Sequence, residues 1–361
     1  MPAKAHGLFD SIASFPALLA AAQRAVRGKR ERHDAAAFFF RLESHLLRLT
    51  DALQAGTWQP GAYREVAVRE PKLRHISIAP FADRVLHQAV HAVVGPVLQR
   101  GYIEDSFASL PGRGQHAAVR RFENFRDRHA FVLRTDIYRY FPSIDHAVLK
   151  ADLARRIGCP RTLALLAQVI DGSNPQKPVH RYFPGDDLFT PFERSRGLPL
   201  GNLTSQMFGN AYLNPLDHFV KEVLRVKGYV RYLDDLALFG HSRAELQDLQ
   251  REVQAFLNGR RLLLHPRKTD IRACDQTLPF LGFELLPGGQ RRLPAANVGR
   301  AWTRLALHRQ AWRQGAHDET ATRQSLAGWV AHARQADTWR LRRRMFPSGW
   351  FHPQGEPPRP R

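Results

Sequence analysis

Three aspartates lie at the end of or between apolar segments, where ionised carboxylates are unfavourable unless they bind a cation or take part in catalysis. Asp136 ends the apolar segment FVLRTD, and the pair Asp234–Asp235 interrupts GYVRYLDDLALFG (228–240) between two segments that read as buried strands. Adjacent carboxylates disfavour each other's ionised form, so such a group needs a cation. Mg²⁺ suits oxygen ligands best, and Mn²⁺ could replace it. Two ions about 4 Å apart are a recurrent device for phosphoryl transfer.

An Asp-Asp pair is weak evidence alone, because paired aspartates are common in turns. The chain has a second pair, Asp186–Asp187, in a Pro- and Gly-rich loop without flanking strand patterns. The order of features is more specific: a strand ending in Asp136, a Gly-rich loop before a long helix, then a Tyr-x-Asp-Asp hairpin. If the two strands are neighbours in one sheet, the carboxylates converge, and this order in a basic chain favours a nucleic-acid polymerase palm.

Composition narrows the class of partner. The 361 residues are 43% hydrophobic, with 54 Lys plus Arg against 33 Asp plus Glu and a formal net charge of +21. This excess favours nucleic acid, then an anionic membrane surface, over a merely solvated basic surface. Two distant cysteines, Cys159 and Cys274, predict no disulfide framework or cysteine-based zinc site and fit reduced thiols in the cytoplasm. The sequence contains no run of 18 apolar residues, so we expect no membrane-spanning helix.

Periodicity places the elements around these motifs. Residues 1–60 are predicted to be helical, and 62–79 to form two strands joined near Glu70–Pro71. Further helices are expected at 81–98, 145–157, 243–259 and from about 295, and further strands at 261–271 and 280–286. The segment 172–196 is irregular, and loops of that length are usually functional or mobile.

Several segments together resemble reverse transcriptases. YLDD (232–235) resembles their YxDD box, and TDIYRYFPSI their earlier metal-binding motif. RHISIAPFADRVLHQAV and FASLPGRGQHAAV resemble fingers motifs, LLLHPRKTDI the motif that carries a lysine, and LPFLGFELL the primer grip. The resemblance spans about 60–290 and implies an α+β right-hand polymerase fold with an antiparallel palm sheet. It divides the chain into an N-terminal helical basic extension (1–60), fingers (61–130), palm (131–290), helical thumb (291–346) and a disordered tail (347–361).

The resemblance assigns roles residue by residue. Asp136, Asp234 and Asp235 would be catalytic and, with Ile137, would hold two Mg²⁺ ions; Asp235 could instead only shape the turn. The residues assigned to the dNTP are Lys72, Arg74, Phe141, Leu200, Gly201 and Lys268. Phe141 would be the gate that occludes a ribose 2′-OH, and Lys268 would protonate pyrophosphate. The residues assigned to template or primer are Arg113, Gln206, Tyr232, Arg300 and Arg304. The alternatives are solvated surface for the cations, core packing for both aromatic residues and helix capping for Gln206.

One segment favours a narrower class. Most bacterial reverse transcriptases carry Gln-Gly in the loop before the long helix. This chain departs from that form, with the segment Leu200-Gly201-Asn202-Leu203-Thr204-Ser205-Gln206. It is similar to the [IVL]GxxxSQ signature of diversity-generating retroelement enzymes, which misread template adenines and act with a small basic accessory protein. The resemblance implies template RNA, RNA/DNA heteroduplex and dNTPs as ligands, and an accessory protein or structured non-coding RNA as partner. An apolar Leu200 beside the incoming base offers no hydrogen bond, so looser base selection is expected.

Three alternative functions compete with this interpretation. Related reverse transcriptases act in antiphage defence and copy a dedicated RNA. A catalytically silent nucleic-acid binding module would be marked by loss of Asp136 or Asp234, and both are present. A metal-dependent nuclease would pair carboxylates with a His or Lys base, and the motif order does not resemble one.

Overall fold

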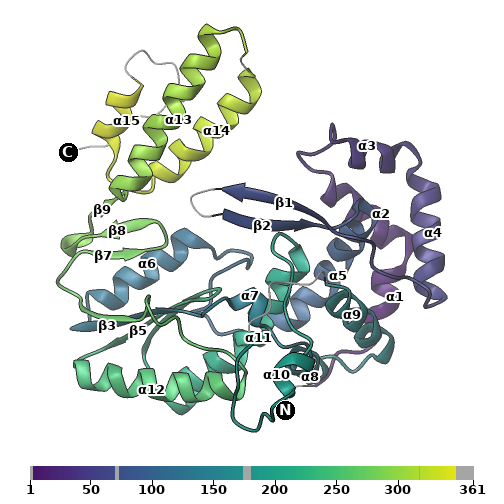
Figure 1. Cartoon of the computed structure of the whole chain (residues 1–361), viewed down its shortest axis with the longest axis horizontal. Coiled ribbons are helices and arrows are strands. Elements are labelled where there is room, and N and C mark those ends of the chain that lie inside the picture. Colours follow the sequence, from purple (N-terminus) through teal and green to yellow (C-terminus); the bar gives the residue numbers. More distant parts are fainter. Residues whose placement is uncertain (1–2, 70–72, 174–179, 317, 347–361) are drawn as a thin grey trace.

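The described part of the chain folds into groups of helices around a four-stranded antiparallel sheet, with two smaller antiparallel sheets beside it (Figure 1). The structure is a computed structural model that describes residues 3–69, 73–173, 180–316 and 318–346. Lys72, the strand junction at Glu70–Pro71, part of the irregular segment and the tail 347–361 lie outside the described residues. None of the helices in the described ranges has the length and apolar character needed to span a bilayer.

The N-terminal region is helical, as its periodicity predicts. Its helices are α1 (Leu8–Ala13), α2 (Phe15–Ala25), α3 (His33–Phe40) and α4 (Leu42–Gln54). Ile12, Leu18 and Leu46 of these helices are fully buried in one core with Leu86 and Val90 of the long helix α5 (Phe81–Gln99). The extension is therefore packed onto the rest of the molecule through α5.

A two-stranded hairpin precedes α5. It consists of β1 (Arg64–Arg69) and β2 (Leu73–Ile78), paired antiparallel from Arg64↔Ile78 to Arg69↔Leu73. The two strands predicted within 62–79 are thus confirmed. In Figure 1 the two strands run from the N-terminal helices across the molecule.

The central sheet has the order β4-β5-β3-β6 and is antiparallel throughout. Its strands are β3 (Phe131–Asp136), β4 (Gly228–Tyr232), β5 (Asp235–Gly240) and β6 (Asp270–Ala273). Alternate residues face opposite sides. Val132, Val230 and Phe239 pack with α6 (Gln115–Arg126), whereas Leu133 and Leu238 pack into the main core with α11 (Leu203–His218) and α12 (Arg243–Gly259). Both faces are therefore covered.

Helix α12 lies below the central sheet in Figure 1, and α11 lies to its right. The long helix predicted after the Gly/Pro loop is α11 (Leu203–His218), which continues into a π-helical turn at Phe219–Val223. The helix predicted at 243–259 is confirmed as α12 (Arg243–Gly259), and Ser242 and Glu245 form a reciprocal capping box at its start. The described helices between β3 and α11 in the sequence are α7 (Tyr140–Ser143), α8 (His146–Ala154), α9 (Pro160–Asp171) and α10 (Thr190–Glu193).

The described end of the irregular segment, 180–196, is anchored by charge. Arg194 contacts both Asp186 and the buried Asp145, whose carboxylate also pairs with Arg261 at 2.5 Å. Asp187 accepts hydrogen bonds from Phe189 and Thr190 at the start of α10. The pair Asp186–Asp187 therefore holds a loop in place, in keeping with its sequence context.

Two strand predictions are corrected at the C-terminal side. The segment 261–271 is not one strand, because Leu264 forms only a single bridge with Ile137 and a turn at 265–268 separates it from β6. Pro266 lacks the amide needed to continue a ladder. FLGFELL is likewise split into β7 (Leu278–Phe280) and β8 (Phe283–Leu285), because Leu281 and Gly282 adopt positive φ and reverse the chain.

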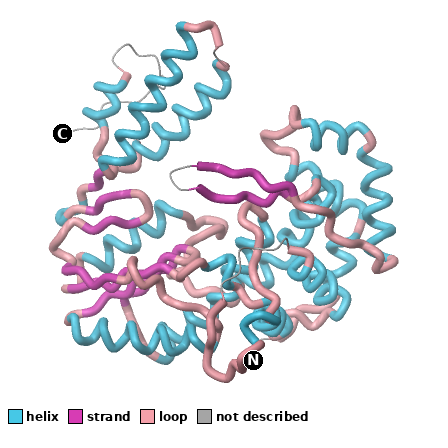
Figure 2. The backbone as a smooth tube through the Cα atoms, viewed as in Figure 1, coloured by secondary structure: helices cyan, strands magenta, loops and turns pink. Residues whose placement is uncertain are grey.

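The chain ends in a small helical bundle beyond β9 (Arg291–Arg292). Its helices are α13 (Ala295–Arg313), α14 (Glu319–Ala333) and α15 (Trp339–Met345), with a core of Leu305, Leu326 and Val330. Figure 2 shows that this bundle stands apart from the sheet layer and is joined to it through the short strands β7–β9. The mixture of helices with antiparallel sheets agrees with the predicted α+β class.

Candidate active site

A tight hairpin turn presents the predicted aspartates. Leu233 and Asp234 form the two-residue turn between β4 and β5, and Leu233 adopts φ 56°. Asp235, the first residue of β5, lies opposite Asp136, the last residue of β3. Directly opposed residues project to the same face. The cross-strand partner of Asp136 is thus Asp235, and Asp234 lies in the turn itself rather than at a strand end.

Backbone hydrogen bonds hold these residues in register with a third segment. Ile137 donates from its amide to the carbonyl of Asp234 at 3.2 Å, and His265 donates to the carbonyl of Asp136 at 2.7 Å. The turn after His265 brings the ammonium of Lys268 into contact with the carboxylate of Asp136. Lys268, which is assigned to the triphosphate, therefore lies at the cluster of aspartates.

The site accumulates negative charge that its own cations do not neutralise. Burial, followed by the charge of Asp136, raises the pKa of Asp234 to about 6, although Lys268 and Arg74 oppose the shift. Burial, then Asp234 and Asp136, raises the pKa of Asp235 to about 7. An all-oxygen donor set with this excess charge fits a hard divalent ion in kind. Within the described ranges, no three His, Cys, Asp or Glu side chains are grouped as a complete metal site.

A fully buried ion pair, Arg231–Asp217, stabilises the turn at Leu233–Asp234. Arg231, 0% exposed, donates to both oxygens of Asp217 at 2.7 and 2.6 Å and to Asn210 Oδ1 at 3.0 Å. Its Nη1 also donates to the carbonyl of Leu233 at 3.2 Å. Burial alone would lower the pKa of Arg231, but Asp217 raises it above its ordinary value. The network therefore ties the turn to α11.

Sequence reasoning did not identify this network. The available signal was an arginine in the middle of an otherwise apolar strand, GYVRY, because a charge at that position must be paired. The identity of its partner, Asp217, could not be read from the sequence, since α11 meets β4 only in the folded chain.

Three chain segments meet where the nucleotide is expected. Leu198 donates to the carbonyl of Phe141 at 2.9 Å, which fixes the loop before α11 to the segment that follows β3. Ser77 of β2 donates to the carbonyl of Leu200 at 3.0 Å, which fixes the same loop to the hairpin. Phe141, half-buried, lies beside Gly209 of α11. Leu200 and Phe141 are thereby held on one framework.

Gly201 allows this close approach. Its φ is +107°, and a Cβ there would lie 2.8 Å from Ile76 Cγ2. We expect Gly201→Ala to destabilise the protein by about 1–3 kcal/mol and to raise the KM for dNTPs, because backbone strain and the clash both displace the loop. Thermal unfolding and primer-extension kinetics would measure this.

Gly328→Ala is the matched control, since Gly328 lies in α14 with open space around it. That variant should be stabilised slightly, as Ala favours helix over Gly. Unchanged stability and KM in Gly201→Ala would contradict the account of the loop.

The remaining predicted residues lie at varied places. Arg74 is exposed on β2, and its charge acts on Asp234. Tyr232 is half-buried and pairs in register with Asp235. Arg300 is exposed on α13, and Arg304 is half-buried. Their contacts with dNTP, primer or duplex stay predictions.

Two residues assigned to the template are engaged within the protein. Arg113 Nη1 donates to the carbonyls of Ile103 and Ser106 at 2.6 and 2.7 Å, which closes the loop before α6. Gln206 Oε1 accepts from Ser109 Oγ at 3.0 Å and joins α11 to the same loop. The geometry gives both residues a role in loop structure, and a template contact by either stays a prediction.

Comparison with known proteins agrees with this geometry. The profile of the family "Reverse transcriptase (RNA-dependent DNA polymerase)" matches residues 68–285, more than half of the chain. The chain therefore belongs to the reverse transcriptase family. Its enzyme class is accordingly that of RNA-directed DNA polymerases.

Individual relatives are distant. Protein YkfC of Escherichia coli (strain K12) is 25% identical over 286 residues, which cover 68% of this chain and 72% of YkfC. The group II intron-encoded protein LtrA of Lactococcus lactis subsp. cremoris is 21% identical over 186 residues, covering 50% of this chain and 29% of LtrA.

Among solved structures, the apo telomerase of Candida tropicalis superposes with a TM-score of 0.50 at 9% identity, covering 81% of this chain and 60% of that one. At this identity the likeness concerns the fold alone, and it agrees with a right-hand polymerase.

Proposed function

We propose that this chain copies an RNA template into DNA by two-metal-ion nucleotidyl transfer. The observation that carries the proposal is the placement of Asp136 opposite Asp235, with Asp234 in the adjoining turn and Lys268 in contact with the group. Asp136, Asp234 and Asp235, with Ile137, would hold the ions. When bound, the metal supplies charge that activates a primer 3′-OH and offsets the charge of the leaving pyrophosphate.

The chain's own residues then orient the reactants. Arg74 places a fork-shaped cation suited to triphosphate oxygens near Asp234. The ring of Phe141, held beside α11, would exclude a ribose 2′-OH and so select dNTPs. Lys268 would donate the proton that pyrophosphate needs on departure. Lys72, outside the described residues, is proposed at the same triphosphate.

Primer and template are assigned to the remaining residues. Tyr232, beside the aspartates in register, would lie under the primer end. Arg300 and Arg304 of α13 would contact duplex phosphates, which gives affinity without sequence choice. Arg113 and Gln206 are proposed at the template, beside the loop that they stabilise.

A primer-extension assay tests the proposal. Purified protein would be given Mg²⁺, four dNTPs and an RNA template with annealed primer, beside reactions that contain rNTPs or EDTA. We expect cDNA only with dNTPs and metal. DNA synthesis that continues in EDTA, or equal use of rNTPs, would contradict the two-metal site or the role of Phe141, respectively.

We further propose an error-prone enzyme of the diversity-generating retroelement type. Its support is the LGNLTSQ segment, with Leu200 held against β2 and Gly201 at a positive φ in a closely packed position. Such an enzyme would work in the cytoplasm with a small accessory protein or a structured non-coding RNA. The alternative is an antiphage-defence enzyme that copies a dedicated RNA; an accurate or repetitive product would favour it.

Leu200→Gln should lower misincorporation opposite template adenines, because an amide beside the incoming base restores a hydrogen-bonding group. Sequencing of cDNA from an adenine-rich template would measure the error spectrum. Leu47→Gln is the control, since Leu47 is 46% exposed on α4. An unchanged spectrum in Leu200→Gln would contradict the role assigned to that position.

A further inference from the structure

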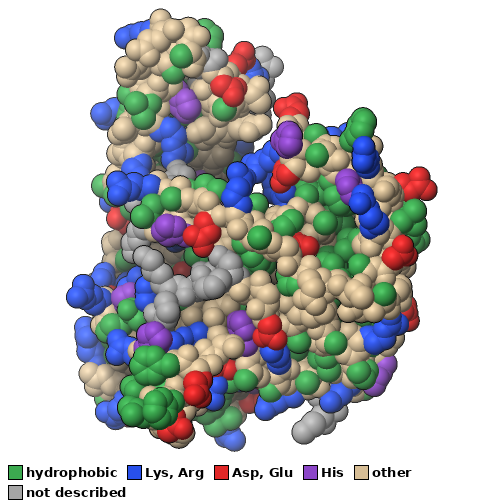
Figure 3. All heavy atoms as spheres, turned by 45° about the vertical axis from the view of Figure 1, so that its right-hand side comes forward, with side chains coloured by type: hydrophobic (Ala, Val, Ile, Leu, Met, Phe, Trp, Pro, Cys, Tyr) green, Lys and Arg blue, Asp and Glu red, His purple; other side chains and the backbone are tan. Residues whose placement is uncertain are grey.

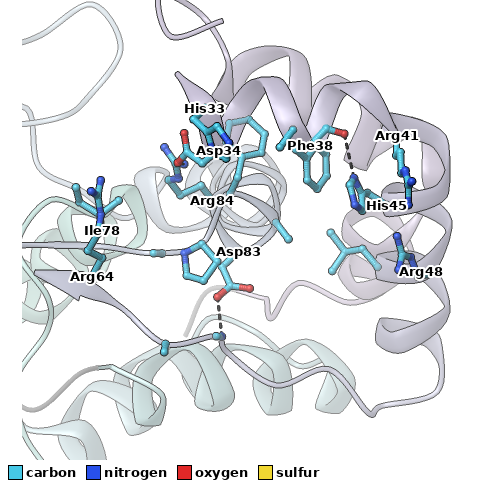
Figure 4. Close-up of a pocket in the computed structure, with 18 of the residues that line it drawn as sticks. His33, Asp34, Phe38, Arg41, His45, Arg48, Arg64, Ile78, Asp83 and Arg84 are labelled. Atoms are coloured by element: carbon cyan, nitrogen blue, oxygen red, sulfur yellow. Dashed lines mark hydrogen bonds and ion pairs between the residues drawn. The ribbon is translucent and has the colours of Figure 1, made fainter. Parts of the chain in front are cut away.

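A large open groove lies at the base of the β1–β2 hairpin, away from the hairpin tip. Its volume is about 1360 Å³, and it is lined by α3, α4, the segment 58–64 and the start of α5. Arg64 and Ile78, the pair at the open end of the hairpin, form one wall. Figure 4 shows these two residues facing α3 and α4 across the groove. None of the catalytic aspartates lines it.

The rim of the groove is strongly basic. Five arginines line it, together with His33 and His45: Arg32, Arg41, Arg48, Arg64 and Arg84. Only two acidic residues line it, and both are engaged: Asp34 pairs with Arg84, and buried Asp83 accepts from the amide of Gly61 at 2.8 Å. Among described residues, Arg32, Arg41 and Arg64 have no carboxylate partner. The groove therefore presents cations that the protein itself does not neutralise.

The floor of the groove is aromatic. Phe38, Trp58 and Phe81 are buried beneath it, and Phe38 stacks on His45 with ring centroids 4.8 Å apart. Phe40 stands at the rim with 85% of its surface exposed, next to Arg41. In Figure 3, hydrophobic side chains gather in the right-hand half of the face, with Lys and Arg at their edges. The exposed ring of Phe40 beside Arg41 suits an unpaired base and its phosphate.

We propose that this groove binds a single-stranded segment of RNA, with phosphates on Arg41, Arg48 and Arg64 and a base against Phe40. Charge complementarity argues for a polyanion, and the exposed ring of Phe40 argues for an unpaired base rather than duplex. An open groove of this size accommodates more than one nucleotide. The inference rests on the RNA-templated reaction proposed above only for the choice of RNA over DNA.

We take the unpaired 5′ part of the template as the source of this segment. The hairpin whose open end forms the groove wall also holds Leu200 through Ser77, which connects the groove to the loop assigned to the incoming nucleotide. Binding of a separate structured RNA with an unpaired loop is the alternative outcome of the test. Both present the same chemistry, and the experiment below distinguishes them.

The test is RNA binding by the full-length protein without dNTPs, so that a failure of catalysis cannot affect it. Fluorescence anisotropy would follow a labelled, unstructured RNA of about twelve nucleotides. We expect Arg41→Ala/Arg48→Ala to weaken binding about tenfold or more and to lower the slope of log K against log salt by about 1.4, or about 0.7 per lost phosphate contact. Phe40→Ala should weaken binding at least about fivefold with little change in that slope.

Arg128→Ala/Arg251→Ala is the matched control, because it removes the same charge from two exposed positions outside the groove. Equal losses in the control and groove variants would overturn the proposal, because binding would then follow net charge alone. Binding unchanged in the groove variants would overturn it as well. Since Phe40, Arg41 and Arg48 are exposed, circular dichroism should show all variants folded.

The source is resolved with primer–template duplexes whose 5′ overhangs have about four or about fifteen nucleotides. If the groove takes the template, the longer overhang raises affinity in the wild type and not in Arg41→Ala/Arg48→Ala. If it takes a separate RNA, overhang length has no effect, while the free oligonucleotide still loses affinity in that variant. As a positional check, RNA carrying 4-thiouridine should crosslink to the peptide that contains Phe38 and Phe40; crosslinks only elsewhere would overturn the proposal.

Discussion

Asp234→Asn should lower the rate of primer extension by at least about a thousandfold, because one charge of the carboxylate group that binds the metal is lost. The same change should stabilise the metal-free protein. Asp234 adjoins the directly opposed pair Asp136 and Asp235, and removing one of three crowded like charges relieves up to about 1 kcal/mol, or about 2 °C in Tm. Loss of activity with gain of stability is specific to a carboxylate group built for a cation.

The measurement combines primer extension with thermal unfolding in EDTA and in Mg²⁺. Mg²⁺ should raise the Tm of the wild type more than that of Asp234→Asn, since ligand binding stabilises the folded state. Asp248→Asn, at a largely exposed position on α12, is the control and should change neither quantity. An active Asp234→Asn protein, or one destabilised in EDTA, would contradict the assignment.

Arg231→Met should destabilise the protein by about 3–5 kcal/mol, because it leaves Asp217 charged, buried and unpaired. The variant also loses the hydrogen bond to the carbonyl of Leu233, so the turn that carries Asp234 is no longer held. Urea unfolding would measure the first effect. Primer extension at a temperature where the variant is folded would measure the second.

The double variant Arg231→Met/Asp217→Leu separates the two roles. Replacing both charges with apolar groups should recover much of the stability, yet kcat should stay low, because neither new side chain can bind the Leu233 carbonyl. Full recovery of kcat in the double variant would show that Arg231 does not position the turn. Arg251→Met/Asp248→Leu, an exposed pair on α12, is the control and should change stability by less than about 1 kcal/mol.

Local sequence patterns predicted many of this protein's helices and strands. Alternation in 62–79 and the apolar segments around Asp136 and Asp234 each specify an element from neighbouring residues alone. The helices at 81–98 and 243–259 were predicted to within a residue or so, because long periodic segments depend little on distant partners. The family could be recognised for a related reason: its motifs are short, ordered and local in sequence.

Features that depend on distant partners were missed or displaced. The chain reversal at Leu281–Gly282 and the break before β6 involve short segments whose pairing is set by neighbours far along the chain. The groove beneath the hairpin combines residues 32–64 with 78–84 and has no contiguous motif.

The sequence by itself determined that three aspartates, a strongly basic chain and an ordered set of polymerase-like motifs occur together. Only the tertiary structure decided that Asp136 faces Asp235 rather than Asp234, that Lys268 joins them, and that a buried Arg231–Asp217 pair supports the turn. The physical reason is that strand register and burial are properties of non-local pairing. A slip of one residue would send each carboxylate to the opposite face of the sheet.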